Sequence, residues 1–114
     1  MRLETKKNLH DVLQASNLIL GFIRGVSLDS YSANAMLRSA VERQFEIIGE
    51  AIYRLARSDE ETARRIPEYR RMIAFRNVLI HGYDGISDEI VWDIVESKVP
   101  GLRSVVEGLL GMSE

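Results

Sequence analysis

The sequence contains no cysteine and only two prolines, Pro67 and Pro100. The absence of cysteine excludes a disulfide framework, a thiolate metal site and a cysteine nucleophile. No apolar run approaches the ~20 residues that a membrane-spanning helix needs. The first residues continue directly into an amphipathic pattern, which is not the pattern of a signal peptide. We therefore expect a cytoplasmic protein that does not enter a membrane.

The length of 114 residues suits a single domain, residues 1–114, with one modest hydrophobic core. The net charge of −2 hides an asymmetry along the chain. Residues 64–83 carry five arginines and one acidic residue, whereas residues 84–114 carry seven acidic and two basic residues. A basic segment can bind phosphate locally, although solvated helix charges are the commoner explanation of such a cluster.

Apolar residues recur at helical spacing nearly throughout the chain, and no sustained strand alternation occurs. The spacing predicts helices over about 3–24 and 30–57, and Gly25 is expected to end the first of them. Further helices are predicted after residue 57. The sequence therefore predicts an all-α, up-and-down bundle of four or five helices joined by short connections.

The second predicted helix has an apolar arc broad enough for two contacts, one with a neighbouring helix and one with a second subunit. Gly49 lies in the middle of this helix, where a glycine costs ~1 kcal/mol of helix propensity. A close approach by another backbone is one reason to accept that cost.

Polar residues at fixed offsets predict where the later helices begin. Ser58 followed by Glu61 is typical of a capping box for a short helix that ends near Arg65. Ser87 is expected to cap a helix further along the chain. Pro100 is expected to start or kink the last helical segment.

The third predicted helix has Pro67 in its first turn and runs to about residue 81. On a helical wheel, Arg76 falls within the apolar arc of this helix, where a solvated charge is not expected. The arginine must therefore be paired, with Glu46 or Glu50 as candidate partners, or face a cleft or a subunit interface.

Polar side chains converge near the end of this helix. Asn77 and His81 are four residues apart and share a face, and Gly82 should end the helix so that Tyr83 lies at the rim. A histidine can take the proton of a ribose 2′-hydroxyl or return one to a leaving oxygen. Arg76 can clamp a phosphate, and asparagine can orient either group.

The chemistry needs two proton transfers, and one candidate histidine per chain serves only one of them. A dimer would supply a second histidine. The residues alone leave a plainer interpretation open, in which His81 interacts with the helix dipole and Arg76 forms a structural ion pair. His10 stands alone on its helix face. With two histidines and no cysteine, we expect no zinc site.

The Arg-Asn-x-x-x-His-Gly-Tyr run at 76–83 resembles the Arg-x-x-x-x-His-x-Tyr signature of the HepT-like branch of the HEPN superfamily. The Glu-Ile-Ile-Gly-Glu-Ala run at 46–51 is similar to that branch, and so is the segment 90–102. The resemblance covers about 37–102. Residues 67–69, Pro-Glu-Tyr, depart from it, since many relatives place tryptophan after the proline; this affects packing and not the site.

The resemblance implies a homodimer in which two such motifs line a shared cleft. It implies an endoribonuclease that cleaves tRNA or mRNA without a metal or other cofactor, with Arg76 and His81 catalytic and Asn77 supporting. In the basic segment, Arg70 and Arg71 are candidates for binding RNA.

The resemblance also implies a protein partner, a nucleotidyltransferase antitoxin of the MntA type in a type VII toxin–antitoxin pair. Such an enzyme transfers AMP from ATP to the signature tyrosine, here Tyr83. Phosphates attached at the rim of the cleft would block RNA and compete for Arg76.

Two other functions stay open from the sequence. One is a noncatalytic nucleotide-binding or adaptor module with the same fold, because an intact residue set does not exclude it. The other is a purely structural dimeric bundle, in which the broad apolar arc of the second helix is the functional surface.

Overall fold

Helices account for most of the chain that the computed structural model describes, residues 1–82 and 86–111. Within these ranges the chain forms seven helices and no strand. The helices are α1 (Leu3–Phe22), α2 (Leu28–Ala33), α3 (Ala35–Ser58), α4 (Glu60–Ala63), α5 (Tyr69–Ile80), α6 (Asp88–Ser97) and α7 (Val99–Gly111). The all-helical bundle predicted from the sequence is confirmed in its class.

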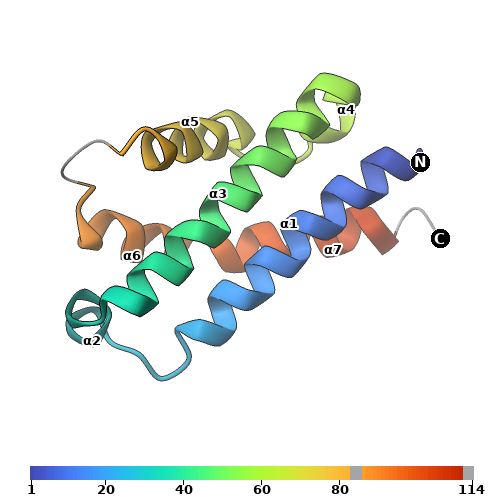
Figure 1. Cartoon of the computed structure of the whole chain (residues 1–114). Coiled ribbons are helices and arrows are strands. Elements are labelled where there is room, and N and C mark those ends of the chain that lie inside the picture. Colours follow the sequence, from blue (N-terminus) through green and yellow to red (C-terminus); the bar gives the residue numbers. More distant parts are fainter. Residues whose placement is uncertain (83–85, 112–114) are drawn as a thin grey trace.

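The two longest helices, α1 and α3, lie against each other, and the rest of the bundle is built on them. Helix α5 packs on α3, and α7 packs on α1 and continues from α6 (Figure 1). The apolar stripes of α1 and α3 face the interior, as their spacing predicts. Their fully buried side chains are Leu9, Val12, Ile19, Val41, Phe45, Ile48, Ile52 and Leu55.

The two helices that follow the candidate site complete the core. Val91 and Val95 of α6 and Val106 of α7 are buried in the same hydrophobic core as the stripes of α1 and α3. Trp92 of α6 packs on Tyr31 of α2, with ring centroids 5.3 Å apart. Ser87 caps α6 by accepting a hydrogen bond from the amide of Glu89, and Pro100 lies in the first turn of α7, as the sequence predicts for both.

The single helix predicted over 30–57 is wrong, because the chain leaves the helical conformation at Asn34. This residue has φ −115° and ψ 95°, and its side-chain oxygen accepts a hydrogen bond from the amide of Leu37 at 3.0 Å. Its side chain thus satisfies an amide that would otherwise lack a partner at the start of α3. Two helices result where the apolar spacing indicates one.

The capping box predicted at Ser58 is also displaced. Ser58 ends α3, and its hydroxyl donates to the carbonyl of Arg54. The cap of α4 is Asp59, whose carboxylate accepts from the amide of Thr62 at 3.2 Å and from its hydroxyl at 2.7 Å. These bonds, with one from Thr5, hold the pKa of Asp59 below its usual range, and the Thr62 hydroxyl is the largest cause. An ionised carboxylate makes stronger hydrogen bonds than a serine hydroxyl.

The start of α5 also differs from the prediction, since Pro67 precedes the helix and Tyr69 begins it. Glu68 is the cap residue and has φ 58°, a left-handed conformation that costs an L-residue about 1 kcal/mol. Its carboxylate is bound by Lys98 at 2.9 Å and by Arg71 of α5 itself at 3.1 Å. Lys98 is the C-terminal cap residue of α6, so its ion pair ties the start of α5 to the junction between α6 and α7.

The predicted helix ends at Gly25 and Gly82 are confirmed, because both glycines have positive φ, 72° and 61°. Such values are unfavourable for residues that carry a Cβ atom. Among the described residues, no helix combines the length and the apolar character that crossing a membrane requires.

Candidate functional site

The site begins with the contact between α5 and α3 at Gly49. A Cβ atom built on Gly49 would lie 2.1 Å from the Cβ of Arg76, 2.8 Å from its Cγ and 3.0 Å from the carbonyl oxygen of Met72. Only a glycine leaves room for α5 at this distance. The close approach predicted from the position of Gly49 is therefore confirmed, and the approaching residue is Arg76.

Arg76 extends from this contact to an acidic partner on α3. Its Nη2 donates to Oε2 of Glu50 at 2.5 Å, and its Nη1 donates to Oδ1 of Asn77 at 2.7 Å. The predicted pairing is confirmed, and Glu50 is the partner. The other candidate, Glu46, pairs instead with Arg43 at 3.2 Å.

The arginine lies at the surface and not in the core. The side chains of Arg76 and Glu50 are 24% and 33% exposed, so water still reaches the pair and a phosphate can approach the guanidinium. Glu50 also binds Arg54 at 3.2 Å. The guanidinium carbon of Arg76 lies 6.0 Å from the ring centroid of Tyr53. The orientation of the Arg76 guanidinium is thus set by Glu50 and Tyr53 of α3 and by Asn77 of α5.

His81 follows in the last turn of the same helix. Its amide donates to the backbone carbonyl of Asn77 at 3.2 Å, and its φ of −82° and ψ of −1° place it at the C-terminal cap of α5. The residue is exposed. The structure therefore places Arg76, Asn77 and His81 on one short helix, with the histidine open to solvent one turn beyond Asn77. Tyr83 lies outside the described residues.

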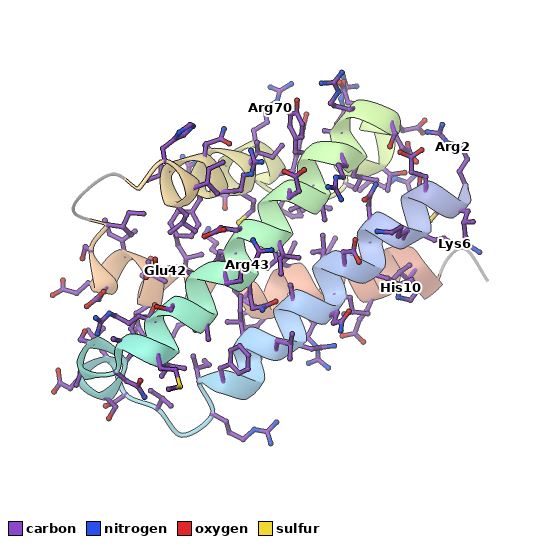
Figure 2. All side chains as sticks on the ribbon, in the orientation of Figure 1. Arg2, Lys6, His10, Glu42, Arg43 and Arg70 are labelled. Carbon is purple, nitrogen blue, oxygen red and sulfur yellow. The ribbon has the colours of Figure 1, made fainter. Side chains whose placement is uncertain are left out.

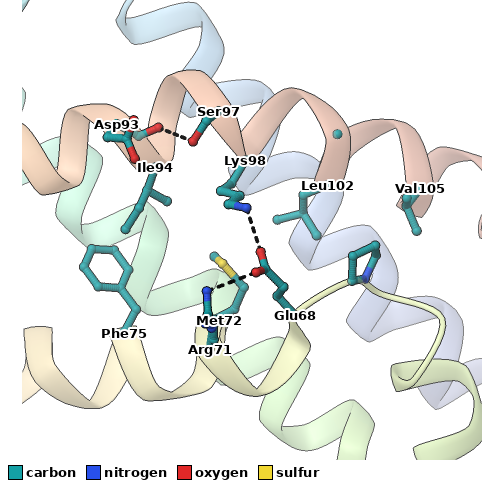
Figure 3. A pocket seen from close by; sticks show the side chains of 12 residues that line it. Glu68, Arg71, Met72, Phe75, Asp93, Ile94, Ser97, Lys98, Leu102 and Val105 are labelled. Carbon is teal, nitrogen blue, oxygen red and sulfur yellow. Dashed lines mark hydrogen bonds and ion pairs between the residues drawn. The ribbon is translucent and has the colours of Figure 1, made fainter.

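The two RNA-binding candidates have different surroundings. Arg71 lines a cavity of about 440 Å³ between α5 and the α6–α7 pair, where it binds Glu68 (Figure 3). Arg70 is exposed, and its Nε donates to the hydroxyl of Tyr69 at 3.1 Å (Figure 2). Arg70 and Arg71 therefore do not bind a common partner, and the basic segment is not one uniform surface.

The cavity beside Arg71 is mainly apolar. Met72 and Phe75 line it from α5, and Lys98 binds Glu68 at its edge (Figure 3). The Lys98 ammonium, followed by Arg71, holds the pKa of Glu68 below its usual range. This cavity is not predictable from the sequence pattern, because its walls come from helices separated along the chain.

Sequence reasoning also missed Tyr53, the aromatic neighbour of Arg76. Its position three residues after Glu50 was a usable signal, because residues three apart share a helix face. Among the described residues, no three His, Asp or Glu side chains gather closely enough to hold a metal ion. His10 is exposed on α1, away from this site (Figure 2).

The whole arrangement lies within a segment that matches a known family. The family model "Ribonuclease HepT-like" matches residues 12–109, which include all of α3, α5 and α6. The chain belongs to the HepT-like ribonuclease family. The resemblance predicted from the motif at 76–83 is confirmed, and so is the assignment to the ribonucleases.

Several curated proteins support the same membership. "Putative RNase MJ1380" of Methanocaldococcus jannaschii is 35% identical over 104 residues, which cover 91% of this chain and 94% of that protein. "Probable ribonuclease HepT" of Thermococcus cleftensis is 31% identical over 109 residues, covering 96% and 98% of the two chains. No solved structure matches the chain significantly.

Proposed function

We propose that the chain is a metal-independent endoribonuclease toxin in which Arg76 and His81 are catalytic and Asn77 supports them. The observation that carries this proposal is the position of Arg76. The Cβ of Arg76 lies directly on Gly49. The side chains of Glu50 and Asn77 orient its guanidinium, which stays accessible to solvent. A guanidinium fixed before the substrate arrives stabilises developing charge without reorganisation.

The residues divide the chemistry between them. His81 removes the proton of a ribose 2′-hydroxyl, whose oxygen then attacks the adjacent phosphorus and forms a cyclic phosphate as the P–O5′ bond breaks. A second proton transfer, to the departing O5′ oxygen, completes the cleavage. Arg76 carries five N–H donors, of which two engage Glu50 and Asn77. The others bind the phosphoryl oxygens in the transition state.

The second proton transfer requires a second donor, which a homodimer provides. Val78 and Ile80 are large apolar side chains beside Asn77 and His81 on α5, and they are 37% and 45% exposed. Exposed apolar groups beside a polar site are typical of surfaces that a partner covers. In the proposed dimer, His81 of one chain removes the 2′-hydroxyl proton and the same residue of the partner protonates the leaving oxygen.

The biological setting rests on family membership. We propose that tRNA or mRNA is the substrate, and that a nucleotidyltransferase antitoxin of the MntA type silences the enzyme by transferring AMP to Tyr83. Since Tyr83 follows the end of α5 by three residues, an attached nucleotide would bring negative phosphates near Arg76.

The ribonuclease assignment is tested with purified protein, total tRNA and excess EDTA. Wild type should cleave, and Arg76→Ala should cleave at least about a hundredfold more slowly, because removal of one preorganised donor costs about 10² to 10³ in rate. Alanine keeps the Cβ that rests on Gly49, so the fold should survive. Arg103→Ala, on α7 and paired with Glu107, is the matched control. Cleavage by all three proteins alike would contradict the assignment of this site.

The antitoxin proposal predicts a separate behaviour for Tyr83→Phe. This variant should cleave RNA at the wild-type rate but should gain no AMP when it is incubated with ATP, Mg²⁺ and a nucleotidyltransferase of the MntA type. The reason is that phenylalanine lacks the hydroxyl that accepts AMP. Intact-mass spectrometry and residual ribonuclease activity measure the two outcomes. A variant that is still modified and silenced would remove Tyr83 from the proposal.

One observation favours a second function, a noncatalytic nucleotide-binding or adaptor module. The Arg76 guanidinium is already neutralised by Glu50 within the chain, as a purely structural ion pair would be. In that case the protein should bind nucleotides or RNA with no turnover, and Arg76→Ala should lower stability without affecting any reaction.

A further inference from the structure

Tyr53 presents an aromatic ring to solvent beside the proposed catalytic arginine. The residue lies on α3, one turn after Glu50, and is 38% exposed. Most of the residue is covered at this exposure, but part of its ring stays open to a ligand. The side chains that contact the ring are cationic.

Cationic side chains surround this ring. The guanidinium carbon of Arg57 lies 5.7 Å from the ring centroid, and its Nη1 donates to the tyrosine hydroxyl at 3.0 Å. The guanidinium carbon of Arg76 lies 6.0 Å from the same centroid. Arg54, the next residue along α3, is exposed and binds Glu50. Two arginines therefore lie over the Tyr53 ring, and Arg54 joins them through the Glu50 carboxylate that it shares with Arg76.

This combination matches the chemistry of unpaired nucleic acid. Every base, whatever its identity, has a π-face that can stack on an aromatic ring. Arginines near such a ring can bind the backbone phosphates. A base within a duplex is stacked on both faces and has no face to offer. The surface is therefore complementary to an unpaired nucleotide and not to a duplex.

We infer that Tyr53, with Arg57 beside it, is a subsite that stacks one unpaired base of the RNA next to the phosphate held by Arg76. The inference rests on the proposed ribonuclease function, because Arg76 sets which phosphate is bound. It names the substrate class more closely, as a single-stranded segment such as an RNA loop. Tyr53 then acts as a binding residue that sets the position of the chain.

Entry of a base requires only a small rearrangement. Arg57 is exposed, and exposed contacts of this kind contribute little to stability. Its side chain can leave the ring face and bind the phosphate of the stacked nucleotide. Arg76 can stay in place, because Glu50 and Asn77 hold it independently of the ring.

The test measures binding in a cleavage-deficient background, so that cutting does not interfere. His81→Ala protein is titrated with a fluorescent single-stranded RNA that contains a cleavage site mapped with wild type. Tyr53→Phe and Tyr53→Leu are added to this background. Tyr53→Phe keeps the stacking ring and should bind within about twofold of the parent, whereas Tyr53→Leu should bind about tenfold more weakly, the scale of one lost base stack.

Abasic substitutions identify the stacked base. A set of RNAs, each lacking one base near the cleavage site, should contain one that binds the parent about tenfold more weakly. The Tyr53→Leu variant should bind this abasic RNA and the intact RNA equally well. The reason is that the variant already lacks the stacking contact that the abasic RNA would remove. Arg57→Gln should reduce the salt dependence of binding by about one phosphate contact.

The outcomes distinguish failure of the base-stacking subsite from failure of the proposed ribonuclease function. If wild type cleaves RNA but Tyr53→Leu binds as tightly as the parent, the subsite is wrong and the ribonuclease assignment stands. If Tyr53→Leu also lowers the molar mass in light scattering, Tyr53 belongs to a contact between two copies of the chain and the subsite is equally wrong. If wild type neither cleaves nor binds RNA, both proposals fall.

Discussion

Replacing His81 with alanine should abolish RNA cleavage while leaving the protein folded. General acid–base catalysis by one side chain contributes about 10² to 10⁴ in rate, and the proposed dimer uses one His81 from each chain for the two proton transfers, so the substitution removes both groups. His81 is exposed at the C-terminal cap of α5, and its backbone amide, which bonds to Asn77, is unchanged by the substitution. The loss should therefore be chemical and not structural.

The measurement is single-turnover cleavage of a defined RNA, with circular dichroism and light scattering on the same samples. The matched control is His10→Ala, because His10 is also exposed but lies on α1. That variant should cleave at the wild-type rate. Normal cleavage by His81→Ala would exclude the proposed role, and equal losses in both variants would indicate a general effect of removing histidine.

The contact between α3 and α5 was partly predictable from the sequence. Gly49 lies in the middle of a predicted helix, where glycine is unfavourable, and Arg76 falls in an apolar arc, where a lone charge is unfavourable. Each of the two positions therefore indicated a close partner. The sequence did not distinguish Glu46 from Glu50, which lie one turn apart on the same face. That choice depends on how far α5 is shifted along α3. Because Arg76 lies directly on Gly49, Glu50 falls within its reach.

Other features could not be read from periodicity. The apolar spacing continues across Asn34, and asparagine also occurs within helices, so nothing in the pattern separates α2 from α3. The cap at Asp59 depends on bonds to Thr62 and to Thr5, which lies far away in the sequence. Tyr53 becomes informative only once α5 brings Arg76 to its ring. The break at Asn34 is a local capping bond that apolar spacing does not mark, whereas the bond from Thr5 to Asp59 and the contact of Arg76 with Tyr53 join distant segments.

The family signature added what geometry alone does not provide. An arginine bound to Glu50 and Asn77 is equally consistent with a structural ion pair. The match of residues 12–109 to the HepT-like family makes chemistry at this pair the stronger interpretation. The structure in turn explains the glycine between the two glutamates of the similar run at 46–51, since α5 contacts α3 directly at Gly49.

Replacing Gly49 with alanine should both destabilise the protein and remove its activity. The new Cβ would lie 2.1 Å from the Cβ of Arg76 and 3.0 Å from a backbone carbonyl of α5, so the whole helix must move away. Overpacking of this kind costs about 1 to 3 kcal/mol, partly offset by the ~1 kcal/mol that alanine gains in helix propensity. Displacement of α5 also withdraws Arg76 from Glu50, and cleavage should fall at least about a hundredfold.

The matched control is Gly108→Ala on α7, an exposed helical glycine whose added Cβ would meet no atom within 4 Å. It should raise the unfolding free energy by up to ~1 kcal/mol and leave cleavage unchanged. The double variant Gly49→Ala/Arg76→Gly removes the closest clash, so it should regain part of the lost stability yet stay inactive. Urea denaturation and tRNA cleavage measure both quantities. If Gly49→Ala is as stable and as active as Gly108→Ala, the close contact of α5 with α3 is not what positions Arg76.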